Sequence, residues 1–189
     1  MPAAPRCRDK DYLAGEETMG AAEIRRAIED ASSYLTANPE AATSTDSAAT
    51  ATVVDGLVVQ VSSTSGVVLT TDMVTSVGGT ATAPSPGWLL RAAESSCVAT
   101  LIAMRAAMLG IVIETLEVTV DSVSDDRGLL GLDDSVPAGP LSGRVSVRLV
   151  APGVEPGLLE EVAAWGVKHC PVCDALERAV PVSVEVVTR

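Results

Sequence analysis

The chain has 189 residues, of which 47% are hydrophobic and 2% aromatic, and Phe is absent. This length allows one compact domain with a core of Val, Leu, Ile, Ala and Met, and the hydrophobic content argues against disorder throughout. The net charge of −12 argues against a nucleic-acid surface, which needs clustered Lys and Arg, and against binding to anionic lipid.

The cellular compartment is predicted from the absence of targeting patterns. No run approaches about 18 consecutive apolar residues, so no membrane span is expected. The N-terminal segment MPAAPRCRDKDYLAGEE has no apolar core of a signal peptide. We therefore expect a cytoplasmic protein whose four cysteines are reduced, catalytic or metal-binding residues.

Composition shifts divide the chain into three parts. A flexible tail is expected at 1–18, and we assign no role to Cys7 within it. Residues 19–46 are predicted to form a helix, over 20–37, and a Thr/Ser/Ala-rich linker. The main domain is predicted over 47–189.

The main domain begins with three predicted strands, at 49–54, 57–63 and 67–72. Asp55-Gly56 is a hairpin turn signal between the first two. The Gly- and Thr-rich segment 73–84 is expected to be a loop.

A long helix is predicted next, because Ser85 can cap it, Pro86 suits its first position and Gly110 ends it. Leu90, Ala93, Cys97, Leu101, Met104 and Met108 recur at helical spacing. The pattern places Cys97 on the buried face of this helix.

The second half of the domain is predicted to contain three more strands and two helices. The strands lie at 112–123, 143–150 and 180–187, and the helices at 155–168 and from Cys170 to about Arg178. Grouped strands around a central helix favour an α+β fold with antiparallel sheets over a parallel doubly wound sheet.

The cysteines leave several interpretations open. A buried thiol such as Cys97 is ordinarily an inert packing residue. Cys170 and Cys173 form a CxxC pair at a helix start, where backbone N–H groups favour a thiolate. A zinc site formed by Cys170 and Cys173 together with Cys97 and His169 is a further interpretation, although adjacent His and Cys residues rarely point to one metal centre. His169 is either a partly exposed residue or a cation beside a thiol.

Two segments resemble the OsmC/Ohr family. They are GGTATAPSPGWLLRAAESSCVATLIAMRAAMLGI and WGVKHCPVCDALERAVPVSVEV. The first has a Gly-rich loop and then Pro86, eleven residues before Cys97, and the second contains Cys170-Pro171-Val172. DDRGLLGLDDSVPAG and the extra N-terminal helix resemble a longer subgroup of the family. The likeness covers about 47–188 in element order.

The resemblance implies an OsmC-like fold, an intertwined homodimer and a thiol peroxidase that reduces organic hydroperoxides in oxidative-stress defence. Cys97 would attack the peroxide and Cys170 would resolve the sulfenic acid as a disulfide, which a dithiol reductant, often lipoyl-linked, would reduce. No metal or other cofactor is implied. Cys173, Glu94 and Arg91 are possible accessory residues.

The chain departs from the family pattern at two points. Active members have Glu after the helix-start Pro, where this chain has Gly87, and an early Arg that holds the thiolate, whereas no Lys or Arg occurs between Arg26 and Arg91. An ionised Glu94, one turn before Cys97, would raise the pKa of that thiol. The cations that remain as replacements are Arg91, Arg105, Lys168 or an arginine of a partner chain.

Three functions therefore stay open. A thiol peroxidase needs an accessible thiol of low pKa. A non-catalytic small-molecule-binding protein needs only an apolar cavity. A disulfide oxidoreductase would use Cys170 and Cys173 alone.

Overall fold

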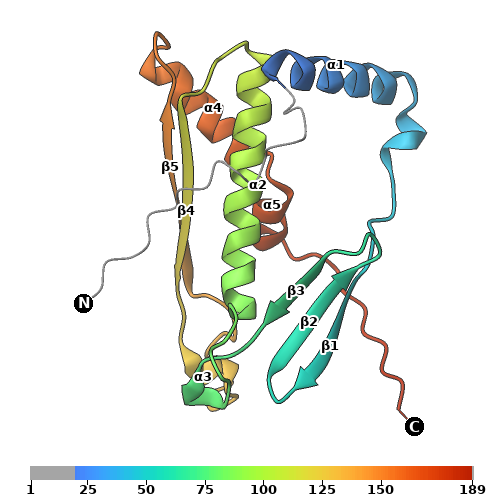
Figure 1. The fold of residues 1–189 in the computed structure, drawn as a ribbon, viewed down its shortest axis with the longest axis vertical. Helices are drawn as coiled ribbons and strands as arrows, with labels where there is room; N and C mark the ends of the chain where they lie inside the picture. Colours follow the sequence, from blue (N-terminus) through green and yellow to red (C-terminus); the bar gives the residue numbers. More distant parts are fainter. Residues whose placement is uncertain (1–19, 189) are drawn as a thin grey trace.

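The central feature of the computed structural model, which describes residues 20–188, is the long helix α2, Pro86–Met108. It packs against α1, β4, α4 and α5 (Figure 1). The fold is α+β with two antiparallel sheets, as predicted. Over these residues no helix is both long enough and apolar enough to cross a bilayer.

Helix α2 has the ends that its sequence predicts. The Ser85 hydroxyl accepts the backbone N–H of Trp88 at 3.2 Å, Pro86 occupies the first turn, and Gly110 follows with φ +70°. The fully buried stripe is Val98, Ile102 and Ala106, one position further along the chain than the face predicted. Cys97 lies beside this stripe and is half-buried, so its predicted full burial is corrected.

Helix α4, Pro156–Lys168, packs closely on α2. Val162 is buried at the contact, and Gly166 faces Ile102. A Cβ atom at Gly166 would stand 2.5 Å from Ile102 Cγ1 and 3.0 Å from Ile102 N. The missing side chain therefore sets how closely the two helices approach.

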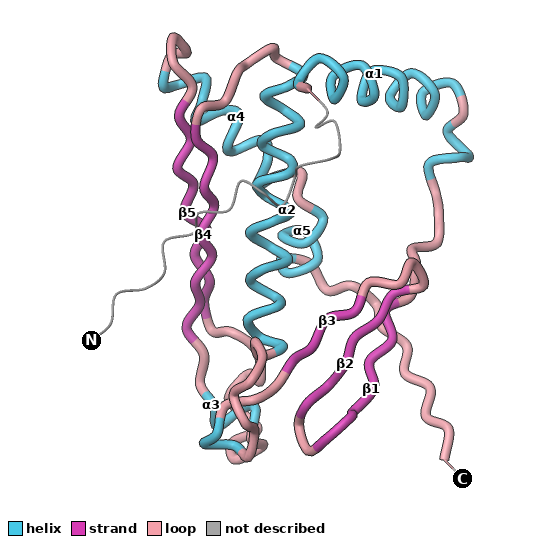
Figure 2. Tube along the Cα trace, in the orientation of Figure 1, coloured by secondary structure: helices cyan, strands magenta, loops and turns pink. Residues whose placement is uncertain are grey.

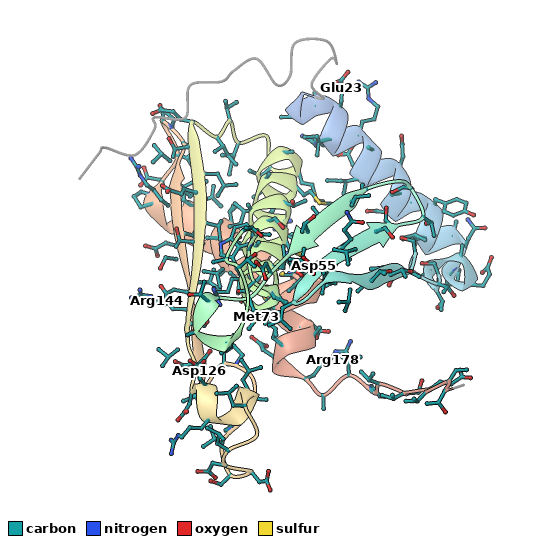
Figure 3. The ribbon with its side chains drawn as sticks, turned by 60° about the horizontal axis from the view of Figure 1, so that its bottom comes forward. Glu23, Asp55, Met73, Asp126, Arg144 and Arg178 are labelled. Atoms are coloured by element: carbon teal, nitrogen blue, oxygen red, sulfur yellow. The ribbon has the colours of Figure 1, made fainter. Side chains whose placement is uncertain are left out.

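A two-stranded hairpin covers another side of α2. Strand β4, Thr115–Val123, pairs with β5, Ser142–Val150, in register from Thr115↔Val150 to Val123↔Ser142. The strand predicted at 112–123 thus begins three residues later, because β5 offers no partner beyond Val150. Figure 3 shows Arg144 at the outer side of this hairpin, and the connection contains the short helix α3, Asp126–Leu129.

The first sheet stands apart from α2 (Figure 2). Strands β1, Ala49–Asp55, β2, Val58–Ser63, and β3, Val68–Thr71, form an antiparallel meander, which confirms the three predicted strands. Strand β1 is exposed along its whole length. Exposed apolar side chains lie across this sheet at Val53, Val54, Val67, Val68 and Leu69.

The two ends of the described chain differ in their agreement with prediction. Helix α1, Ala21–Ala37, forms as expected, with the 3-10 helix η2, Pro39–Ala42, after it, but only Ile24 and Ile28 of its apolar face are half-buried. The strand predicted at 180–187 is wrong: after Arg178 the chain runs away from α5 without pairing (Figure 3). Alternation of valines does not make a strand without a ladder partner.

Candidate active site

Three cysteines from two distant parts of the sequence meet beside α2. Cys97 comes from α2 itself, Cys170 caps the short helix α5, Pro171–Glu177, and Cys173 lies in that helix. Cys170 is 0% exposed and Cys173 is 6% exposed, and Cys97 packs against the core cluster that contains both. The predicted helix start at Cys170 is confirmed, and it brings the CxxC pair to the central helix.

Cys170 is the thiol whose surroundings most favour ionisation. Burial raises its pKa, but the backbone N–H of Cys173, which lies 3.3 Å from Cys170 Sγ, and the thiols of Cys97 and Cys173 outweigh burial, so the pKa of Cys170 falls below its ordinary value. Of the three thiols, Cys170 is therefore the one best prepared to carry negative charge.

Cys97 has the opposite tendency. Burial is the largest effect and raises the pKa of Cys97, and the interaction with Cys170 raises it further, against a smaller lowering by the backbone of Val172. The two side chains thus lie close enough for each to shift the other's pKa. In the reduced protein Cys97 is mainly a protonated thiol at neutral pH.

Cys173 interacts with Glu94 across the space between α5 and α2. Its Sγ atom lies 3.8 Å from Glu94 Oε1. Burial, the Cys170 thiol and the nearby negative charges, Glu94 among them, raise the pKa of Cys173 to about 12. From the sequence, Glu94 was considered as a neighbour of Cys97, one turn away on α2, but the contact that forms is with Cys173.

A cavity of about 370 Å³ opens beside Cys173. Arg91 and Glu94 of α2 line it, and Arg91 Nη1 donates to Ser122 Oγ of β4 at 3.2 Å. Neither Cys97 nor Cys170 lines this cavity. Its apolar wall includes Leu90, Val120, Val145, Val167 and Leu176.

Gly87 leaves open space at the position where the resemblance predicts Glu. A Cβ atom there would lie 4.0 Å from Arg91 Nη1 and 3.9 Å from Ser85 Oγ. Of the three cations within the chain named as replacements, Arg91 is the one at the cavity. Arg105 lies 5.2 Å over the ring of Trp165, and Lys168 is exposed in the last turn of α4.

His169 is engaged with its own helix. Its Nδ1 atom lies 2.8 Å from the carbonyl oxygen of Trp165, and the two rings stack with centroids 4.1 Å apart. The imidazole is exposed, which agrees with the reading of His169 as a surface residue. Over residues 20–188 no three His, Cys, Asp or Glu side chains converge to hold a metal ion.

Sequence reasoning missed Asp72, which is 1% exposed and holds the loop that leads into α2. Its Oδ2 atom accepts the backbone N–H groups of Thr80 and Thr82, at 3.0 and 3.1 Å, and both threonine hydroxyls, at 2.6 and 3.2 Å. Oδ1 accepts the N–H of Met73 at 2.7 Å, and the Asp72 N–H donates to the Pro84 carbonyl at 3.1 Å.

These hydrogen bonds, the Thr80 hydroxyl foremost, hold the pKa of Asp72 well below its usual range despite burial. Thr80 and Thr82 follow Gly78-Gly79, and a Cβ atom at Gly79 would stand 1.9 Å from the Met73 carbonyl oxygen. A buried carboxylate therefore fixes the entry to the helix that carries Cys97. In the sequence, Asp72 followed by Thr80 and Thr82 at alternate positions was the signal that could have predicted this hydrogen-bonded loop.

Several solved structures share this fold. An organic hydroperoxide resistance protein OsmC from Legionella pneumophila aligns with 21% identity and a TM-score of 0.53, over 71% of this chain and 90% of its own. OsmC-like proteins from Mycoplasma pneumoniae, at 15% identity and TM-score 0.61, and from Vibrio cholerae, at 12% and 0.60, cover 72% and 71% of this chain and 91% and 95% of their own.

No curated protein matches the sequence. The family model described as OsmC-like protein matches residues 79–185, which is more than half of the chain and includes α2 and the three cysteines of the site. This protein therefore belongs to the OsmC-like family.

Proposed function

We propose that this protein is a thiol peroxidase that reduces organic hydroperoxides with Cys97 and Cys170. The observation that carries the proposal is the meeting of these two thiols, from α2 and from the start of α5, in one buried cluster. The relative from Legionella pneumophila named for hydroperoxide resistance supports the choice of peroxide as oxidant.

The proposed reaction has three steps. The Cys97 thiolate attacks the outer peroxide oxygen, the O–O bond breaks, and the alcohol leaves with a proton, so that Cys97 becomes a sulfenic acid. Cys170 then attacks the Cys97 sulfur, forms a disulfide and releases water. An external dithiol, such as a lipoyl group, finally reduces the disulfide and is itself oxidised.

The surroundings of the two thiols suit a slow first step and a fast second step. The raised pKa of Cys97 leaves little thiolate at pH 7. The lowered pKa of Cys170 makes it a ready nucleophile for the sulfenic acid. With Gly87 in place of the family Glu, Arg91 is the cation that lines the cavity beside Cys173.

We also propose that the protein works as a homodimer in the cytoplasm. Apolar side chains of β1–β3 are exposed, and so are those of the C-terminal segment, where four valines are 76–82% exposed: Val182, Val184, Val186 and Val187. Large exposed apolar side chains gathered in this way are typical of an interface. A reducing compartment suits a cycle that starts from free thiols.

The deciding experiment is stopped-flow consumption of cumene hydroperoxide by the reduced protein and by Cys97→Ser. We expect wild type to consume peroxide and Cys97→Ser to lose turnover. Ser96→Ala, at the exposed neighbouring position, is the matched control and should react like wild type. A Cys97→Ser protein that still turns over would refute the proposed role of Cys97.

A disulfide oxidoreductase is the second candidate, favoured by the lowered pKa of Cys170 and its contact with the Cys173 N–H. Mass spectrometry after one equivalent of peroxide separates the two. A Cys97–Cys170 disulfide supports the peroxidase, and a Cys170–Cys173 disulfide that forms equally in Cys97→Ser supports the oxidoreductase. No oxidation at all supports a small-molecule-binding protein.

A further inference from the structure

A two-cysteine cycle does not use Cys173, although Cys173 has two contacts in the site and lines its cavity. Its backbone N–H touches Cys170 Sγ at 3.3 Å, and its thiol lies 3.8 Å from Glu94 Oε1. It is also the cysteine that lines the 370 Å³ cavity, while Cys170 is fully buried and does not line it. A reductant in that cavity thus meets Cys173, and the Cys97–Cys170 bond lies outside the lining.

We propose that Cys173 is a third redox residue, which moves the disulfide from Cys97–Cys170 to Cys170–Cys173 and so presents it to the reductant in the cavity. Glu94 is the base for this step. The inference rests on the proposed peroxidase function, since that reaction supplies the first disulfide.

The exchange balances without a further oxidant or reductant. The Cys173 thiol passes its proton to Glu94, and the thiolate attacks Cys170 Sγ. The Cys170–Cys173 bond forms as the Cys97–Cys170 bond breaks, and Cys97 leaves as a thiolate that takes up one proton. A dithiol then reduces Cys170–Cys173 from the cavity and becomes a disulfide itself.

The charges in the cluster determine when Cys173 can ionise and so when this exchange can occur. In the reduced protein, burial and the neighbouring Cys170, Glu94 and Cys97 groups raise the pKa of Cys173 to about 12, so its thiol stays protonated. Once Cys97 and Cys170 are joined, neither can carry charge, and two of those causes disappear. Cys173 therefore becomes easier to ionise only after the first disulfide has formed.

The test counts peroxide equivalents without any reductant. Reduced protein receives two equivalents of cumene hydroperoxide, and samples are alkylated at intervals and mapped by mass spectrometry. Wild type should show Cys97–Cys170 first and Cys170–Cys173 later. The freed Cys97 should then consume the second equivalent and become sulfenic acid. Cys173→Ser should stop at one equivalent with Cys97–Cys170 intact.

Glu94→Gln tests the base. We expect the transfer between disulfides to slow by about tenfold at pH 7, less than the 10²–10⁴ typical of general-base catalysis because loss of the Glu94 charge also makes Cys173 easier to ionise. Transfer in this variant should recover as the pH rises. Glu160→Gln, at an exposed position on α4, is the control and should transfer at the wild-type rate.

The results distinguish failure of the relay from failure of the peroxidase. A wild-type protein that keeps Cys97–Cys170 and consumes one equivalent overturns the relay and leaves the peroxidase standing. If peroxide does not oxidise Cys97, the peroxidase fails, and diamide replaces peroxide in the same mapping. Formation of Cys97–Cys170 followed by transfer then still supports the relay, whereas a protein that never forms Cys97–Cys170 overturns it.

Discussion

Gly166→Ala tests whether the approach of α4 to α2 depends on the missing side chain. The added Cβ would stand 2.5 Å from Ile102 Cγ1 and 3.0 Å from the Ile102 backbone nitrogen, whereas ordinary contacts begin at 3.4 Å. The helices must therefore move apart by several tenths of an ångström at this point, because backbone cannot rotate away. Overpacking of this kind costs about 1–3 kcal/mol.

The matched control is Gly157→Ala, at the start of the same helix, where nothing lies within 4 Å of the added Cβ. Both substitutions gain from the better helix propensity of Ala, by up to about 1 kcal/mol, so the comparison isolates the clash. We expect the Gly166 variant to be less stable than the Gly157 variant by about 1–3 kcal/mol, which for a chain of this size lowers Tm by roughly 2–12 °C.

Urea and thermal unfolding measure this difference, and a double-mutant cycle locates its cause. Ile102→Ala alone is expected to cost about 2–5 kcal/mol, since the side chain is fully buried. Combined with Gly166→Ala it should cost less than the sum, by roughly 0.5–3 kcal/mol, because each change makes room for the other. Equal stability of the two glycine variants would refute the close-packing argument.

Three further predictions concern the loop, the thiols and the assembly. Because the folded-state pKa of Asp72 is lowered, Asp72 stabilises the fold fully above its unfolded pKa of about 4 and progressively loses this contribution as pH falls toward the folded value. Asp72→Asn should thus lower Tm at pH 7 and flatten the acid limb of the Tm profile, and exposed Asp46→Asn should do neither. Cys170→Ser should speed the first oxidation of Cys97 at pH 7, because it removes an interaction that raises the pKa of Cys97, and it should stop turnover. An unchanged first step in stopped flow contradicts that coupling. Light scattering at micromolar concentration should give the mass of a dimer, and a monomer mass contradicts the proposed covering of β1–β3.

Local signals in the sequence were sufficient for most elements. Ser85-Pro86 and Gly110 bounded α2, Asp55-Gly56 placed the first hairpin, and Cys170-Pro171 marked the start of α5. Each of these signals acts within one turn of chain, through a cap, a restricted φ or a left-handed residue. Such effects do not depend on the rest of the fold.

The predictions that failed concern packing. The valines at 180–187 alternate as a strand does, but within residues 20–188 they have no partner to complete a ladder. The buried face of α2 lies one position from the predicted one, because leucines and methionines were counted as core. The residues that are buried are Val98, Ile102 and Ala106, and Ile102 faces Gly166 of α4. Helical periodicity identifies a stripe but does not choose which neighbour covers it.

The site shows the same division. The sequence was enough to predict that Cys97 lies on a long helix and that Cys170 and Cys173 begin a short one, because capping and turn residues act locally. Packing between distant segments sets the contact of Glu94 with Cys173 and the hydrogen bonds by which Asp72 holds the loop before α2. It also lowers the pKa of Cys170 and raises the pKa of Cys97. These features depend on burial and on distances between groups far apart in the chain, and a pKa responds to those distances rather than to sequence spacing.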